Sequence, residues 1–300
     1  MDDPNAWPPL PLAAWEDTRA TLHMWTQIAG KVRLALSPAV NHWWQVPLYV
    51  SPCGLTTSAI PYQGEAFEME FDFAADQLAI RKTGGAATFV RLYARSVAEF
   101  YGEVMATLHA MGIDVKIWPV PVEIANPIPF ADDREHASYD PGPVQRFHRI
   151  LLRTDTIFKE FRGRFVGKAS PVHFFWGSFD LAATRFSGRR APEREGADPI
   201  TREAYSHECS SAGFWPGGGE IAGAAFYSYA APEPSGYGAY AAPPLAQYHK
   251  GMGEFILMYD DLRQAASPRA ALLDFLQTTY DAAAGLGNWD RANLERQGGQ

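Results

Sequence analysis

The sequence predicts an α+β protein made of two pseudo-repeats, each consisting of a long helix, an antiparallel β-meander and a closing helix. Two long helical patterns share the same spacing, and a histidine followed by aromatic residues comes after each of them. Because the order of the elements and the identity of these residues repeat together, we interpret the chain as a duplication. Residues 1–140 form the first repeat with its linker, and residues 141–300 form the second.

The two long helices are predicted by apolar or small residues that recur at alternating steps of three and four, which places them along one helical face. These positions are Trp15, Thr18, Leu22, Trp25, Ala29, Val32 and Leu36 in the first repeat and Phe147, Leu151, Thr154, Phe158, Phe161 and Phe165 in the second. The pairs Ser37-Pro38 and Ser170-Pro171 follow them. Proline disfavours helical backbone at the residue before it, so we expect each helix to end there.

Strand-like segments rich in aromatic and β-branched residues come next in both repeats. Residues 67–73 alternate between apolar and acidic side chains, which is typical of a strand with one buried and one solvated face. The other expected segments are those that begin at His42-Trp43-Trp44 and His173-Phe174-Phe175-Trp176, and 78–82, 89–93, 115–124, 224–230 and 254–259. Gly84-Gly85 is a turn signal, so we infer antiparallel meanders.

Each repeat closes with a helix whose first residues carry a capping signal. Ser96 and Glu99 have the spacing of a capping box. Ser267 is suited to cap a helix that has Pro268 in its first turn. The proline-rich, acidic stretch 127–142 is interpreted as the connection between the repeats, which places their boundary near residue 140.

The composition is that of an ordinary globular protein and argues against several functional classes. With 47% hydrophobic and 20% charged residues, a chain of 300 residues can bury a large core. A net charge of −8 without a basic run argues against nucleic-acid binding. No stretch is apolar enough to span a membrane and no signal peptide is visible. Cys53 and Cys209 lack zinc or redox spacing, so we expect a cytoplasmic protein in a reducing compartment.

Residues 187–223 of the second repeat are the leading candidate site, because they are expected to form a long loop rich in glycine, proline and charged residues. This segment contains His207 and Glu208. An imidazole that titrates near neutral pH, oriented by a neighbouring carboxylate, suits general acid-base catalysis. We therefore predict His207 and Glu208 as catalytic residues, and a solvated loop pair is the alternative.

The preceding segment, 173–189, contributes further candidates. His173 is a third catalytic candidate, with a structural histidine as the alternative. Arg185 is expected to clamp an anionic group, because a planar guanidinium suits carboxylate or phosphate. The predicted ligand-binding residues are Arg185, Asp180, Tyr205, Trp176 and Trp215. If strand alternation continues through the segment, His173 and Asp180 point to opposite faces unless a bulge occurs, for example at Gly177.

Other kinds of chemistry have weaker support. His173, His207 and Glu208 are suitable ligand types for zinc or iron, but they lack a metal-binding spacing, so we predict no metal and identify no cofactor. Gly217-Gly218-Gly219 lacks the Lys-Ser/Thr of a P-loop, and a tight turn is the preferred interpretation. Cys209 follows the His207-Glu208 pair, which leaves a nucleophilic role open.

Four runs in the second half resemble those of a bacterial family, domain-of-unknown-function family 5996. The runs are SPVHFFWGSFDLAA (170–183), RFSGR (185–189), EAYSHE (203–208) and GFWPG (213–217). The resemblance spans nearly the whole chain. It implies no activity, cofactor or catalytic residue.

Two functional hypotheses follow from the sequence. The first is a small-molecule-binding protein or enzyme with an acid-base site in the second repeat or between the repeats. The second is a non-catalytic binding or interaction protein, which would use the aromatic residues around Trp43-Trp44, 174–176 and 226–229 as a cleft or as a homodimer surface. Convergence of the candidate side chains on one concave site favours the first hypothesis.

Overall fold

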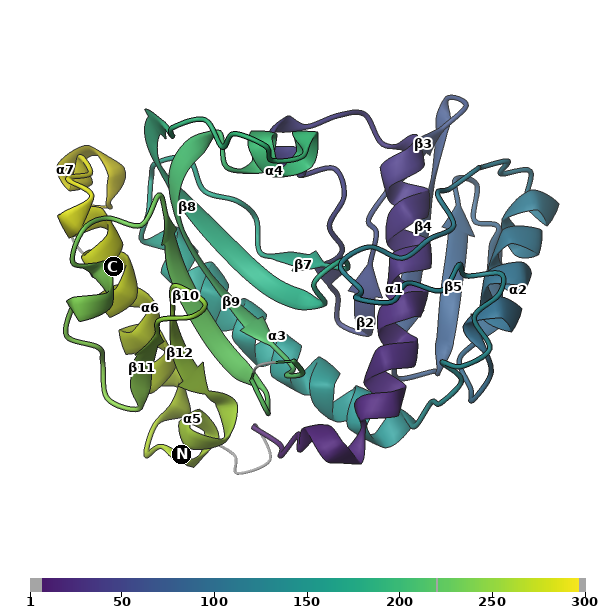
Figure 1. Cartoon of the computed structure of the whole chain (residues 1–300). Coiled ribbons are helices and arrows are strands. Elements are labelled where there is room, and N and C mark those ends of the chain that lie inside the picture. Colours follow the sequence, from purple (N-terminus) through teal and green to yellow (C-terminus); the bar gives the residue numbers. More distant parts are fainter. Residues whose placement is uncertain (1–6, 220, 297–300) are drawn as a thin grey trace.

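The computed structural model describes residues 7–219 and 221–296 and confirms the α+β class, with helices packed against two antiparallel sheets (Figure 1). A long helix, an antiparallel sheet and a further helix follow one another twice along the chain. The longer helices are α1 (Glu16–Leu36), α2 (Val97–Ala110), α3 (Pro141–Gly163) and α6 (Pro268–Leu286). Shorter helical segments are η1 (Leu12–Ala14), η2 (Asn41–Trp43), α4 (Pro199–Ala204), η3 (Tyr237–Ala239), α5 (Tyr259–Gln264) and α7 (Arg291–Leu294).

The first sheet is a meander with the spatial order β1-β2-β4-β5-β6, and β3 pairs with β4. Its strands are β1 (Tyr49–Val50), β2 (Gly54–Thr56), β3 (Ile60–Tyr62), β4 (Glu65–Asp72), β5 (Gln77–Lys82) and β6 (Ala87–Arg91). Phe67, Met69 and Phe71 of β4 are buried, while the acidic residues between them are partly exposed. Phe71 packs on Phe100 of α2, which stacks on Trp25 of α1. The alternation in the sequence therefore corresponds to one face covered by helices.

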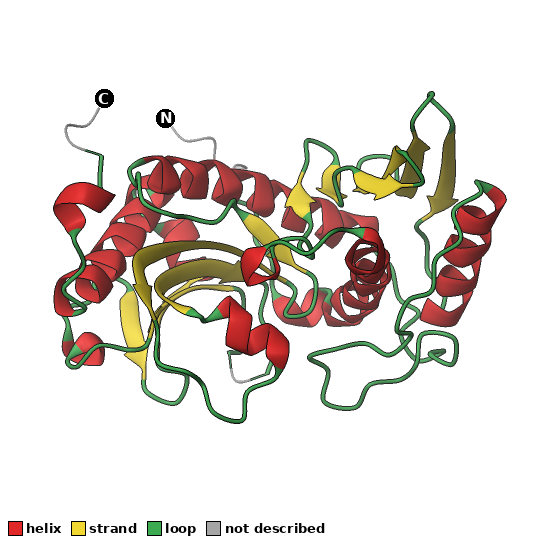
Figure 2. Cartoon of the chain, turned by 90° about the horizontal axis from the view of Figure 1, so that it is seen from above, coloured by secondary structure: helices red, strands yellow, loops and turns green. Residues whose placement is uncertain are grey.

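The second sheet has the spatial order β7-β8-β9-β10-β12-β11. Its strands are β7 (His173–Phe175), β8 (Asp180–Arg190), β9 (His207–Trp215), β10 (Ala225–Ala231), β11 (Ala246–His249) and β12 (Glu254–Met258). Helices α3 and α6 cover one face of this sheet. Phe147 and Phe158 of α3, for instance, contact Phe214 of β9 and Phe226 of β10. The short helix α4 lies on the opposite side of the sheet from α3 and α6 (Figure 2).

The two halves of the chain share one hydrophobic core. Leu48 and Phe174 exchange backbone hydrogen bonds of 2.8 Å, which joins the start of the first sheet to β7 of the second. Every residue of α1 from Thr21 to Arg33 is buried, because the second half packs against the side of this helix that the amphipathic pattern leaves polar. As a result α1 runs through the middle of the molecule, between the two sheets (Figure 1).

Most predicted helix ends are confirmed. The Ser96 hydroxyl accepts a hydrogen bond from the Glu99 backbone N–H at 3.2 Å, and the Glu99 carboxylate accepts one from the Ser96 N–H at 2.9 Å. The prediction that the second long helix continues to Ser170-Pro171 is wrong, since α3 ends at Gly163. The residues after it form isolated bridges to β8 and to the C-terminal segment instead.

Residues 115–124 do not form the predicted strand. The Gln27 side chain on α1 donates to the Val122 carbonyl and accepts from the Val122 N–H, both at 2.9 Å. The Gln27 side-chain amide therefore makes the two backbone hydrogen bonds that a neighbouring strand would otherwise make. Pro119 and Pro121 also lack the N–H groups that a sheet ladder needs.

The prediction of a long loop over residues 187–223 is also wrong. Strand β8 continues to Arg190, α4 follows, and β9 begins at His207. Because β9 lies between β8 and β10 and pairs with both, sheet pairing outweighs the weak strand propensity of its small residues. The segments that remain irregular are the short stretches on either side of α4 and β9.

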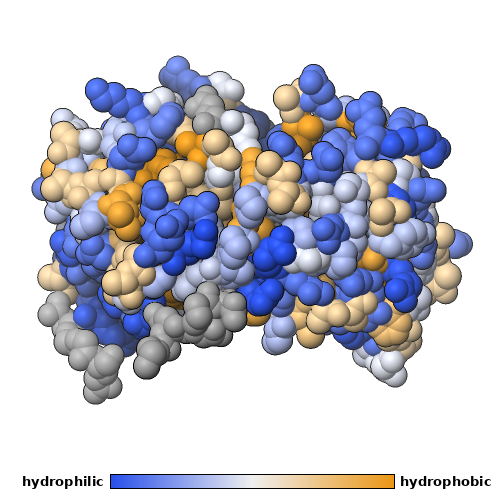
Figure 3. Space-filling view, turned by 90° about the horizontal axis from the view of Figure 1, so that it is seen from below, coloured by the Kyte–Doolittle hydropathy of each residue, from blue (hydrophilic) through white to orange (hydrophobic). Residues whose placement is uncertain are grey.

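The surface seen from below is mainly hydrophilic, with the larger hydrophobic areas over the half that holds the second sheet (Figure 3). Within residues 7–219 and 221–296, no helix is long and apolar enough to cross a membrane.

Candidate functional site

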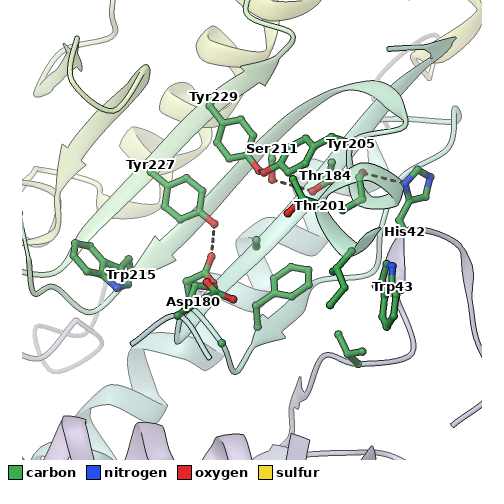
Figure 4. Close-up of a pocket in the computed structure, with 18 of the residues that line it drawn as sticks. His42, Trp43, Asp180, Thr184, Thr201, Tyr205, Ser211, Trp215, Tyr227 and Tyr229 are labelled. Atoms are coloured by element: carbon green, nitrogen blue, oxygen red, sulfur yellow. Dashed lines mark hydrogen bonds between the residues drawn. The ribbon is translucent and has the colours of Figure 1, made fainter. Parts of the chain in front are cut away.

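A cavity of about 920 Å³ lies on the face of the second sheet that is turned away from α3 and α6 (Figure 4). Successive side chains of a strand point to opposite faces, so alternate residues of β8, β9, β10 and β12 form its floor. The opposite wall comes from α1, η2, α4 and the segment around Glu123. We refer to this space as the sheet cavity. Its walls therefore derive from both halves of the chain.

The floor of the sheet cavity carries three pairs of hydrogen-bonded polar side chains. Tyr227 of β10 donates its hydroxyl hydrogen to Asp180 of β8, which also accepts from Ser178. The hydroxyls of Tyr205 and Tyr229 lie 2.8 Å apart, and those of Thr184 and Ser211 lie 2.9 Å apart. Tyr227 and Tyr229 project from β10 side by side toward these partners, with ring planes only 16° apart (Figure 4). The result is a polar floor between aromatic walls.

A glycine makes room for Tyr227. Gly213 of β9 lies directly opposite Tyr227 in the register of β9 and β10. A β-carbon at Gly213 would overlap the far end of the Tyr227 ring, so the ring lies flat over this position and its hydroxyl reaches Asp180. The backbone at Gly213 is ordinary strand, which means that the glycine is needed for space rather than for conformation.

Four carboxyl groups lie in the cavity wall, those of Glu123, Asp180, Asp198 and Glu254, and none of them forms an ion pair within the described chain. Burial raises the pKa of Asp180, and its hydrogen bonds only partly offset this effect. Burial and the nearby charge of Asp180 raise the pKa of Glu123, and the same two causes raise the pKa of Glu254 to about 7. Glu254 can therefore exchange a proton near neutral pH.

Several strained backbone positions lie in or beside the wall of the sheet cavity. Glu123, His42, Trp43 and Phe179 all have φ between 57° and 60°, a region that residues other than glycine rarely adopt. The carboxyl group of Glu123 fits against Gly177, where a β-carbon would overlap it. Such strain costs about 1–3 kcal/mol per residue and persists where the surroundings fix one geometry. The positions of these side chains are therefore tightly specified.

The cavity wall contains one amine and borders another. Lys31 of α1 lies 5.6 Å from the centre of the Trp176 ring, and burial lowers its pKa to about 8. At the other end, the Lys168 amine lies 2.8 Å from His42 Nε2, while His42 Nδ1 lies 3.1 Å from the Ala204 carbonyl. Burial and the positive charge of Lys168 lower the pKa of His42, so this imidazole is neutral at neutral pH.

Four of the predicted ligand-binding residues line the sheet cavity: Asp180, Tyr205, Trp176 and Trp215. They come from β8, the end of α4, the turn before β8 and the end of β9. The condition under which His173 and Asp180 were expected to point to opposite faces, continued strand alternation, is not met. A turn over residues 176–179 intervenes, and Phe175 pairs with Asp180, so His173 and Asp180 lie on the same face.

His207 and Glu208 are not brought together in the cavity. They are neighbours in β9 and so point to opposite faces of the sheet. Glu208 forms an ion pair with Arg189 at 2.6 Å, and the Arg189 guanidinium also donates to the carbonyls of Gly287 and Asn288 at the end of α6. The His207 ring makes an edge-to-face contact with the His42 ring, with the ring centres 5.6 Å apart.

Neither Arg185 nor His173 lines the cavity, although His173 packs against Trp44 and Phe175, which do. The Arg185 guanidinium lies 3.5 Å from the centre of the Phe161 ring and 4.3 Å from that of Tyr280, and it donates to the Phe161 carbonyl. It faces α3 and α6 and cannot reach a ligand in the cavity. Both ring nitrogens of His173 lack a partner within the described chain, and burial lowers its pKa to about 3.

Cys209 does line the cavity, but its environment does not activate the thiol. Burial raises the Cys209 pKa to about 12, whereas nucleophilic cysteines need a lowered pKa. In the described ranges 7–219 and 221–296, no group of three or more His, Cys, Asp or Glu side chains is arranged to hold a metal ion.

Sequence reasoning did not single out Lys31, Glu123, Tyr227 or Glu254. Glu254 could have been identified as a lone acid at the start of the apolar strand β12. Tyr227 could have been identified from its place in an aromatic run. Glu123 gave no signal, because its position depends on contacts across the two halves of the chain.

The family model described as "Family of unknown function (DUF5996)" matches residues 7–296. The chain belongs to this DUF5996 family. No curated protein and no solved structure matches it. The match covers both sheets and all the residues that line the sheet cavity, so the cavity belongs to the part of the chain that defines the family.

Replacing Glu254 with glutamine should change how stability depends on pH. The Glu254 pKa is raised from 4.5 to about 7, so its protonated form stabilises the fold at low pH. That contribution is fully present below about pH 4.5 and is lost as the pH rises through about 7. We expect Glu254→Gln to be about 1–2 kcal/mol more stable than wild type at pH 8, a value reduced for partial exposure. Urea unfolding of both proteins at pH 5 and pH 8 tests this prediction. An equal difference in the free energy of unfolding between variant and wild type at the two pH values would contradict it.

Proposed function

We propose that the protein is an enzyme that performs acid-base chemistry on a small molecule in the sheet cavity, with Asp180 as the proton-transferring group and Tyr227 as its hydrogen-bonding partner. One observation carries this proposal. A buried carboxyl group lies at the floor of a cavity of ligand size, and hydroxyl groups rather than a basic side chain hold it. Its raised pKa brings proton exchange toward neutral pH, where general acid-base catalysis is most effective.

Tyr227 has a complementary role in this proposal. Burial and the neighbouring Asp180 raise its pKa well above 10, so the phenol remains protonated and acts as a hydrogen-bond donor. The phenol has a single hydrogen, so Tyr227 can stabilise negative charge on a substrate oxygen once that hydrogen turns from Asp180 to the substrate, as Asp180 moves its proton. Gly213 supports this arrangement because it leaves space for the Tyr227 ring.

A second candidate function is ligand binding without chemistry. The aromatic side chains of Trp43, Trp215, Tyr227 and Tyr229 favour it, because a largely aromatic pocket can bind an apolar ligand without any proton transfer. The two candidates differ in one outcome. An enzyme converts its ligand, whereas a binding protein releases it unchanged.

The test is a thermal-shift and mass-spectrometric screen of a metabolite mixture with wild-type protein and with Ala182→Phe. Ala182 lies on the cavity floor between Asp180 and Thr184, so a phenyl group there would occupy the ligand space. Ala106→Phe, at an exposed position on α2, is the control.

We expect at least one compound to raise the Tm of the wild type and of Ala106→Phe but not of Ala182→Phe, and to be chemically altered by the first two proteins. Binding without alteration would favour the second candidate function. A compound that shifts all three proteins equally would show that ligands bind elsewhere.

We further infer that the two halves arose by duplication, with the boundary near residue 140. Three features support this. Each half has a helix before and after its sheet, consecutive strands pair antiparallel from β4 to β6 and from β7 to β10, and Asp140 caps the start of α3. Separate expression of residues 1–140 and 141–300 is expected to give poorly folded fragments that associate, because the hydrophobic core includes residues of both halves.

A further inference from the structure

The charge of the sheet cavity indicates the class of its ligand. Among the described residues that line it, four are acidic, Glu123, Asp180, Asp198 and Glu254, and Lys31 is the single lysine or arginine. Asp198 is engaged in capping α4, since it accepts hydrogen bonds from the backbone of Ile200 and Thr201. The remaining three carboxyl groups have no cationic partner within the described chain.

The same cavity has walls made of aromatic faces. Trp43, Trp176, Trp215, Tyr227 and Tyr229 line it, and the two tyrosine rings are stacked. The face of an aromatic ring is electron-rich and attracts cations, most strongly where water is excluded. Lys31 already shows this contact in one part of the wall, where its amine lies 5.6 Å from the centre of the Trp176 ring.

We propose that the sheet cavity recognises a small organic cation, an alkylammonium or quaternary ammonium group, held by the carboxylates of Glu123, Asp180 and Glu254 and by the surrounding aromatic rings. This inference rests on the proposed function in one respect, namely that the cavity is the ligand site. An anionic ligand would face three carboxyl groups with Lys31 as its single cationic contact. A neutral ligand would leave those carboxyl groups without a cationic partner.

The position of Glu123 supports a built site rather than a chance acidic surface. Its backbone has φ 57°, and Gly177 leaves the space that its carboxyl group occupies. The segment that carries it is fixed to α1 by the two Gln27 hydrogen bonds to Val122. The first half of the chain therefore places a carboxyl group over a floor that the second half supplies.

The experiment compares matched cations and neutral molecules by titration calorimetry at about pH 8, where Glu254 is ionised. One pair is choline and its uncharged isostere 3,3-dimethylbutan-1-ol, and the other is hexane-1,6-diamine and hexane-1,6-diol. The proteins are wild type, the double variant Glu123→Gln/Glu254→Gln, and Glu68→Gln as a control. Glu68 carries the same substitution on β4 of the first sheet, away from the cavity.

We expect each cation to bind wild type and Glu68→Gln at least about tenfold more tightly than its neutral partner. The double variant should lose most of this preference, because the substitution keeps the side-chain shape and removes the charge. Equal binding of cation and neutral partner, a preference that the double variant retains, or no binding of any probe would overturn the inference.

These outcomes separate the cation inference from the proposed enzyme. If the metabolite screen yields a neutral or anionic substrate whose conversion depends on Asp180, the acid-base function stands and the cation inference fails. If the cations bind as expected but Asp180→Asn converts the identified ligand as fast as wild type, the cation site stands and the assignment of Asp180 fails.

Discussion

Asp180→Asn is expected to slow conversion of the substrate found in the metabolite screen by a factor of about 10²–10⁴, the usual contribution of a positioned acid-base group. Asparagine keeps the size and the accepting oxygen of the side chain but cannot exchange a proton. The Tyr227 hydroxyl can still donate to that oxygen, so the cavity should keep its shape. The measurement is kcat at several pH values, and the pH dependence that comes from Asp180 should disappear from the variant.

Gly213→Ala provides a second route to the same result without touching either polar group. The added methyl group should turn the Tyr227 ring away from Asp180, so kcat should fall toward that of Tyr227→Phe. Gly102→Ala on α2, where the added carbon meets open space, is the matched control. If Asp180→Asn and Gly213→Ala both retain wild-type kcat, Asp180 and Tyr227 do not act on the substrate.

Arg185→Ala is expected to lower the free energy of unfolding by about 3 kcal/mol without changing ligand affinity. The Arg185 side chain fills the space between α3, α6 and β8, and its guanidinium lies against the rings of Phe161, Phe165 and Tyr280. Alanine would leave a cavity there. The measurement is urea unfolding at pH 7, combined with calorimetry of the ligand found in the screen.

Arg185→Met separates packing from charge in this prediction. Methionine fills much of the same space and removes a buried positive charge that has no hydrogen-bonded carboxylate, so it should recover more than half of the loss. If Arg185→Ala has wild-type stability but binds the ligand much more weakly, the result would instead support the role of Arg185 as an anion clamp that the sequence predicts.

The sequence predicts the parts of this fold in which local pattern and tertiary packing agree. The alternation in β4, the capping box at Ser96 and the end of α1 before Ser37-Pro38 are examples, because each depends on neighbouring residues or on burial of one face. Strand β9 was missed because its small and polar residues are strand-like only when β8 and β10 pair on both sides. The end of α3 at Gly163 likewise depends on bridges to distant segments.

The candidate site is predictable to a smaller extent. Asp180, Tyr205, Trp176 and Trp215 were proposed from residue type and do meet in one cavity. The pairing of His207 with Glu208 relied on a loop, and a strand places these neighbours on opposite faces of the sheet. Glu123 and Lys31 come from the other half of the chain, so their place in the cavity depends on how the halves pack.

The most direct test of the central claim, that the sheet cavity is the ligand site, is a crystal structure of the protein with the compound that raises its Tm in the metabolite screen. We predict that the compound lies between Trp43 and Trp215, over Tyr227, with one of its atoms within hydrogen-bond distance of Asp180. A compound bound elsewhere, with the cavity unchanged, would contradict both the proposed function and the assignment of these residues.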